Sequence, residues 1–137
     1  MTVRDRNDRV VFESGKLQPD GSIAGNDNDA DPHRFEPHYS RITNTEQVQI
    51  YEDILGDQKG QVTTGLLAAT GYLKDNRLLP RGFNKQTDDR DIAVVGDALN
   101  DPNFRDGADR VRYSVELGDA QGPLRIEASA DRLPLGE

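Results

Sequence analysis

The C-terminal part of the chain decides the fold class. It reads VRYSVEL at residues 111–117, GDAQG at residues 118–122 and PLRIEASAD at residues 123–131. Every second residue of the first segment is apolar, which is the period of a half-buried strand. The same alternation returns between Leu124 and Asp131. Two such segments joined by a short Gly/Asp connection are typical of a hairpin, so we predict that these two strands pair with one face on a core.

Further strand patterns lie upstream. Residues 9–14 form a short strand pattern that ends at Gly15, and Asp20-Gly21 offers a turn because glycine accepts positive φ. Residues 47–55 and 62–73 flank a Gly-containing connection and predict a second hairpin, and residues 91–99 predict another strand. The segment 62–73 also fits helical spacing. Strand is preferred because Gly65 and Gly71 disfavour a helix and its threonines favour strand.

These segments together predict an all-β chain of about seven or eight short strands. That number and spacing favour an antiparallel β-sandwich of immunoglobulin-like or jelly-roll type, with a barrel as the weaker alternative. A length of 137 residues is that of one domain. We expect residues 1–8 to be a flexible lead-in, residues 9–133 to be the single sandwich domain and residues 134–137 to be a C-terminal tail.

Composition excludes several classes of protein. The chain carries 25 acidic and 17 basic residues, a net charge of −8, and it has no cysteine and no tryptophan. Nucleic-acid binding needs a concentrated basic surface, which this charge disfavours. No apolar run is long enough for a membrane-spanning helix. Without cysteine there is no disulfide, no thiolate metal site and no covalent haem attachment within this chain.

The acidic segment at residues 25–31, GNDNDAD, is a candidate calcium site. Asp27, Asp29 and Asp31 place oxygen ligands at alternate positions, as a hard cation requires. The twelfth position counted from Asp27 is His38 where a helix–loop–helix calcium site has glutamate. Calcium in a sandwich loop therefore stays open beside the simpler interpretation, a solvated acidic loop, which we favour.

Two pairs of side chains are candidates for contact with a ligand or partner. His33 and His38 are the two histidines of the chain, but their spacing is not that of a metal site, so ordinary loop or half-buried histidines are the preferred interpretation. Arg77 and Arg81 lie in a segment rich in hydrogen-bonding groups and could hold a carboxylate or phosphate. A polar corner between strands is the preferred role of that segment.

A hydrolytic role rests only on abundant carboxylates. The acidic stretch between residues 88 and 109 could supply an acid and a base for glycoside cleavage, but surface solvation is the expected role of its members Asp88, Asp89, Asp91, Asp97, Asp101, Asp106 and Asp109. The serines lack the context of a nucleophile elbow. We therefore predict that the chain is not an enzyme.

Four segments carry a resemblance to a known family. They are FESG at residues 12–15 followed by Asp20-Gly21, QVQIYE at residues 47–52, the run from Lys74 to Phe83, and GADRVRY at residues 107–113. Together they resemble the non-haem β domain of exported bacterial multihaem c-type cytochromes, over most of residues 9–130. Since this chain has no cysteine, the resemblance reaches the β domain alone and carries over no haem ligand.

The resemblance implies a non-catalytic accessory or interaction domain in an electron-transfer setting, periplasmic or secreted. Its partner would be the haem-bearing region of a parent protein or another redox protein, and haem would belong to the parent alone. Acidic surfaces steer such encounters. The alternative from a different class is a free-standing module for calcium-assisted recognition of carbohydrate or a cell surface, for which the loop at residues 25–31 is the supporting feature.

Overall fold

The computed structural model describes residues 1–87 and 89–132. Strand makes up 22% and helix 5% of it, so the predicted β-rich fold is confirmed, while the sandwich type is not confirmed. The elements, in chain order, are β1 (Thr2–Arg4), β2 (Val10–Glu13), α1 (Asp27–Ala30), β3 (Arg41–Ile42), β4 (Asp53–Gly56), β5 (Gly71–Asp75), the 3-10 helix η1 (Asp97–Leu99), β6 (Arg112–Tyr113) and β7 (Arg125–Glu127). Among the described residues, the strands form one sheet of three strands and two of two strands.

The three-stranded sheet has the order β2-β1-β7, and both of its pairings are antiparallel. Val3 in the central strand is 2% exposed and lies opposite Phe12. The prediction of a flexible lead-in at residues 1–8 is therefore wrong. Asp5 explains the error, because its carboxylate accepts the backbone N–H groups of Asn7 and Arg9 and so forms the turn between β1 and β2. The polar residues of this turn have the same composition as a disordered chain end, so the sequence alone did not distinguish the two.

The predicted C-terminal hairpin is wrong in its pairing. β6 pairs in parallel with β3, and β7 pairs with β1. The alternation of residues 111–117 nevertheless identifies the buried face, since Val111, Tyr113 and Val115 pack against the apolar cluster of Val3, Phe12 and Ile42. Residues 125–127 are all exposed, so the second half of the pattern marks a strand at a sheet edge rather than a core strand.

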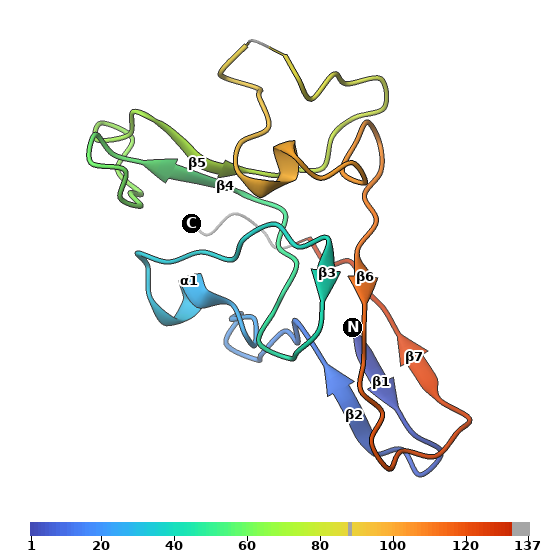
Figure 1. Ribbon diagram of the computed structural model, residues 1–137. Coiled ribbons are helices and arrows are strands. Elements are labelled where there is room, and N and C mark those ends of the chain that lie inside the picture. The colour runs from blue at the N-terminus through green and yellow to red at the C-terminus, as the bar shows by residue number, and fades with distance from the viewer. Residues whose placement is uncertain (88, 133–137) are drawn as a thin grey trace.

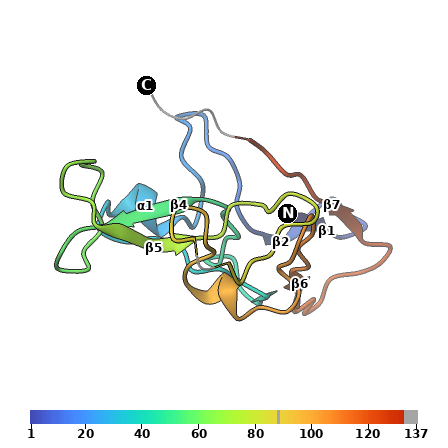
Figure 2. The same cartoon turned by 90° about the horizontal axis from the view of Figure 1, so that it is seen from above.

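The predicted hairpin between residues 47–55 and 62–73 is confirmed in its antiparallel pairing but not in its bounds, because the paired strands β4 and β5 span only residues 53–56 and 71–75. Val62 bridges to Gly56, but residues 66–68 turn at the far end of the hairpin, where Leu66 and Leu67 are exposed. The hairpin and the three-stranded sheet lie at opposite ends of the molecule (Figures 1 and 2).

The segment 91–99 is not the predicted strand. Only Val95 makes a β-bridge, to Asp75, and η1 begins at Asp97. Its apolar residues instead supply a second small core, in which Val94 and Ala98 pack with Phe104. A short apolar run does not by itself distinguish a strand from an irregular buried segment. The second core lies beside the group of polar side chains described next.

Candidate functional site

Half of the buried side chains are polar. Among the described residues, eight buried side chains are apolar and eight are polar or charged; the polar set is Asp5, Ser14, Glu36, His38, Lys74, Asp75, Asn76 and Asp101. Polar groups are buried only at a cost unless they are hydrogen-bonded. The arrangement of their partners therefore determines what these side chains can do.

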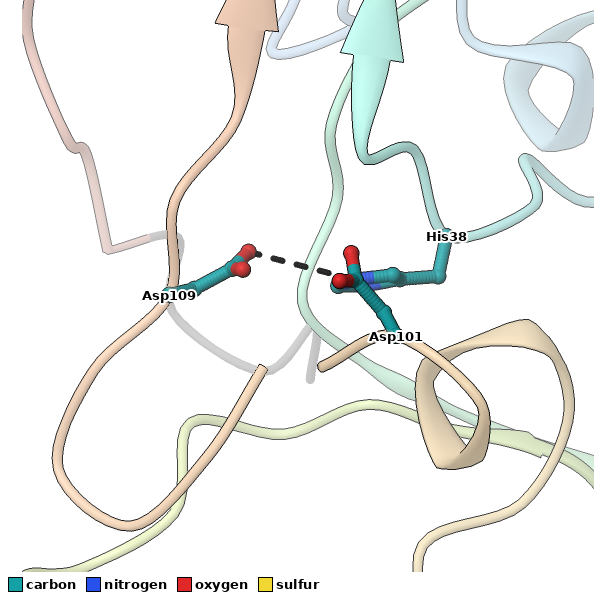
Figure 3. A group of neighbouring side chains, drawn as sticks. All are labelled: His38, Asp101 and Asp109. Carbon is teal, nitrogen blue, oxygen red and sulfur yellow. Dashed lines mark ion pairs between the residues drawn. The ribbon is translucent and has the colours of Figure 1, made fainter. Parts of the chain in front are cut away.

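The group of His38, Asp101 and Asp109, here called the His38 cluster, joins three separate parts of the chain. His38 precedes β3, Asp101 follows η1 and Asp109 precedes β6 (Figure 3). The imidazole Nε2 lies 3.4 Å from Asp101 Oδ2 and 3.9 Å from Asp109 Oδ2. The three side chains are only 1%, 5% and 3% exposed, in that order. His38 Nε2 and Asp101 Oδ2 are buried without a hydrogen-bond partner.

The other ring nitrogen of His38 faces two side-chain amides. Gln49 Nε2 lies 2.9 Å and Asn76 Nδ2 lies 3.1 Å from Nδ1. The orientation of each amide is set by a backbone donor, because Tyr39 N–H donates to Gln49 Oε1 and Glu52 N–H donates to Asn76 Oδ1. Turning either amide over would place two N–H donors against each other. Nδ1 is therefore a hydrogen-bond acceptor.

Aromatic rings and burial complete the electrostatics of the His38 cluster. The ring of Phe104 packs edge-on against the imidazole at 5.0 Å, and Tyr51 OH donates to Asp109 Oδ2 at 2.6 Å. Burial lowers the pKa of His38, and this effect outweighs the opposing attraction of Asp109 and Asp101. Burial and the bond to Asp109 raise the pKa of Tyr51. Both side chains are thus uncharged at neutral pH.

The His38 cluster has the composition of a metal site, and its ligand atoms lie within 4.8 Å of one another. A histidine that binds a metal through Nε2 almost always donates an N–H from its other nitrogen to a carboxylate, a carbonyl or water. Nδ1 of His38 instead faces the N–H groups of Gln49 and Asn76. Nε2 must then carry the proton of the neutral ring, so a metal ligated by His38 does not fit this hydrogen-bond pattern.

Lys74 is a second buried charged group near His38. Its Nζ donates to Glu52 Oε1 at 2.8 Å and to the carbonyl of Ile50 at 3.0 Å. Burial lowers the pKa of Lys74, while the pair with Glu52 opposes that shift. Asn76 Nδ2 donates to the same carbonyl of Ile50 at 2.8 Å. These contacts satisfy the backbone of the irregular segment that precedes β4.

Glu36 is another buried charged group, and it connects this interior to α1. It accepts the backbone N–H of Asp27 at 3.2 Å and the hydroxyl of Tyr39 at 2.8 Å. Burial, followed by the hydrogen bond to Glu36, raises the pKa of Tyr39. The carboxylate thus replaces water as the acceptor for two donors, which is a structural role.

The carboxylates of the predicted calcium loop have separate partners. Asp27 pairs with Arg34, Asp29 accepts the backbone N–H of Ile23, and Asp31 accepts that of His33. These aspartates do not belong to the group of converging metal-ligating side chains found among the described residues. The prediction of a plain loop is wrong in one detail, since residues 27–30 form the one-turn helix α1 with Asn26 as its N-cap. Calcium at this loop stays the untested alternative to a solvated acidic loop.

The two histidines differ in their surroundings. His33 is exposed, whereas His38 is enclosed, with its Nδ1 facing two amides and its Nε2 buried beside two carboxylates. As the side chains are placed, His38 does not reach a ligand or partner from the surface. His33 remains available for such contact.

Arg77 and Arg81 lie in the predicted polar corner. The guanidinium of Arg77 donates two hydrogen bonds to Asp75 and lies 5.6 Å from the ring centre of Tyr72. This pairing raises the pKa of Arg77, whose side chain is half exposed but already paired with Asp75. Arg81 is exposed at a turn where Gly82 N–H donates to Asp106. Of these two arginines, Arg81 is the one left for an outside ligand.

Surface solvation is the wrong expectation for two members of the acidic stretch. The side chains of Asp101 and Asp109 are both buried. The nearest signal is Phe104, an isolated aromatic residue three positions after Asp101, which marks the local chain as core. Asp88 lies outside the described residues.

No family model, curated protein or solved structure matches this chain. None of the described helices has the length and apolar character needed to cross a membrane.

Proposed function

We propose that this chain is a non-catalytic accessory domain that binds the haem-bearing region of an exported multihaem c-type cytochrome. The proposal that the domain is non-catalytic is supported by the burial of the His38 cluster. General acid–base work needs a side chain within hydrogen-bond reach of a substrate. The side chain of His38 is 1% exposed, its Nδ1 faces two amides and its Nε2 is buried beside two carboxylates, so neither nitrogen is within reach of a substrate.

Exposed apolar side chains support an interaction role. Leu66 and Leu67, at the end of the β4–β5 hairpin, are 82% and 105% exposed, and Ile126 in β7 is 64% exposed. Single exposed apolar residues are ordinary on protein surfaces. Two adjacent leucines at full exposure, in the uncharged segment from residue 60 to residue 73 of an otherwise highly charged chain, are more typical of a surface that is covered by a partner.

The haem-bearing partner is proposed from the four segments that resemble the cytochrome-associated domain. The net charge of −8 suits it, since an acidic surface raises the rate of encounter with a basic redox protein and does so less as salt is added. The electron-transfer steps would then belong to the haem region, and this domain would supply contact surface.

The coding sequence around this chain tests the proposal first. Cys-x-x-Cys-His motifs in the same reading frame, together with an export signal, are the expected result. If they are found, the haem-bearing segment is produced separately and titrated with this domain by calorimetry at low and high salt. A reading frame without haem motifs would refute the proposal, as would a haem segment that does not bind.

A further inference from the structure

The His38 cluster holds a histidine with a predetermined tautomer. Its Nδ1 is approached by the amide N–H groups of Gln49 and Asn76, at 2.9 and 3.1 Å. A neutral imidazole has one N–H and one lone pair. Because Nδ1 must supply the lone pair, Nε2 carries the hydrogen.

Nε2 lies beside two carboxylates without forming a hydrogen bond to either of them. Asp101 Oδ2 and Asp109 Oδ2 lie 3.4 and 3.9 Å from Nε2, which is longer than an ordinary N–H···O bond. The attraction is still effective, since the side chains are almost completely enclosed and charge is poorly screened there. Tyr51 OH donates to the same Oδ2 of Asp109, and the backbone N–H of Asn103 donates to the other oxygen of Asp101, Oδ1.

We propose that the His38 cluster is a proton-sensitive contact that holds the segment from Asp101 to Asp109 against the rest of the domain, and that acidification opens it. The second proton of an imidazolium would have to sit on Nδ1. There it would meet the N–H groups of Gln49 and Asn76 and find no acceptor. His38 therefore cannot be protonated in place, and charging it requires the ring to leave this position.

The charged groups around the ring act in opposite directions. Asp101 and Asp109 favour the imidazolium, whereas Lys74, on β5, disfavours it. Tyr51 stays neutral as a donor to Asp109. The N–H groups of Gln49 and Asn76 also disfavour the imidazolium, because they face Nδ1, the nitrogen that would gain the second proton. The carboxylates lie on the Nε2 side of the ring. Once the ring leaves, Asp101 and Asp109 lose the Nε2–H group that lies beside them, and Phe104, which packs on the imidazole, becomes accessible.

Nitrogen-15 NMR of the histidine rings tests the tautomer directly. The chain has two histidines, so His33, which is exposed, serves as the reference in the same sample. At pH 8 we expect His38 to show a bare Nδ1 and a protonated Nε2. From pH 8 to pH 4 we expect this pattern to persist until the signals of His38, Phe104 and Tyr51 change together.

Two results would overturn the proposal. One is a proton on His38 Nδ1 at pH 8. The other is a gradual titration of His38 during which the ring signals of Phe104 and Tyr51 stay in place.

The variant Gln49→Glu turns one opposing donor into an acceptor. Its second carboxylate oxygen can receive an N–H from Nδ1, while the first still accepts from Tyr39 N–H. We expect His38 in this variant to gain its second proton at a higher pH than in the natural chain. Gln58→Glu, at an exposed position in the β4–β5 turn, adds the same charge away from the ring and leaves the midpoint unchanged. Equal midpoints in the natural chain and Gln49→Glu would contradict the role given to the amides.

Zinc provides an independent readout. The natural chain, freed of metal and titrated with Zn²⁺, is expected to show no change in the His38 signals, since Nε2 has no lone pair to offer. Gln49→Glu creates the carboxylate–histidine arrangement typical of metal ligands and is expected to bind Zn²⁺ at least about tenfold more tightly than the natural chain. Stoichiometric Zn²⁺ binding by the natural chain that shifts His38 would refute the tautomer assignment.

Discussion

Phe104→Ala is the substitution that most directly tests whether the small second core stabilises the domain. Phe104 is 0% exposed and packs with Val94 and Ala98. Removing a fully buried phenylalanine side chain costs about 3–5 kcal/mol through lost burial and the remaining cavity. The ring also makes an edge-on contact with His38 at 5.0 Å and a stacked contact with Tyr51 at 6.5 Å. Such aromatic pairs add about 0.5–1.5 kcal/mol each. We therefore expect Phe104→Ala to lower the free energy of unfolding by about 4–5 kcal/mol, near the upper end of the range for a buried phenylalanine.

A loss of about 4–5 kcal/mol is large for a domain of this size, since total stability is typically about 5–15 kcal/mol. Urea unfolding followed by circular dichroism and tyrosine fluorescence measures it, and the chain has no tryptophan to mask the tyrosine signal. The matched control is Leu67→Ala, an apolar truncation at a side chain that is 105% exposed, for which we expect a change within about 0.5 kcal/mol. The reasoning is refuted if Phe104→Ala costs less than about 1 kcal/mol.

Three further outcomes are expected. The pKa of His38 in the folded chain is lowered from its ordinary value of 6.5, so the unfolded chain binds the proton more readily. The contribution of His38 to stability is therefore present above pH 6.5 and is lost as the pH falls below it. Urea midpoints at pH 7.5 and 5.5 should differ more for the natural chain than for His38→Gln. Val3→Asp places an unpaired carboxylate in the central strand of the three-stranded sheet and should cost about 3 kcal/mol or more, and an unchanged melting temperature would mean that β1 does not hold the sheet. Millimolar calcium should leave the melting temperature unchanged, since the carboxylates of Asp27, Asp29 and Asp31 have separate partners; a rise of several degrees would support the calcium loop.

Alternation of apolar residues locates buried faces but does not choose strand partners. Residues 111–115 do place alternate side chains on the apolar cluster around Val3, as their pattern predicts. The partner of that strand is nevertheless β3, which lies far away in sequence, and the partner of β7 is β1. β4 and β5 were predictable as a pair because they follow one another in the chain, and consecutive strands are usually neighbours in space. β1 was missed because three residues are too few to display a period.

The chemistry of the His38 cluster could not be predicted from its ligand-type residues. A buried histidine facing two carboxylates has the composition of a metal site, and the separations of its atoms would admit one. Two neutral amides decide otherwise, and their orientations depend on single backbone N–H groups, those of Tyr39 and Glu52. Neither amide belongs to a residue type that a search for metal ligands or catalytic groups would select. The function of such a cluster therefore has to be inferred from the nitrogen that faces away from the carboxylates, since the proton on one side of an imidazole is determined by the hydrogen bond on the other.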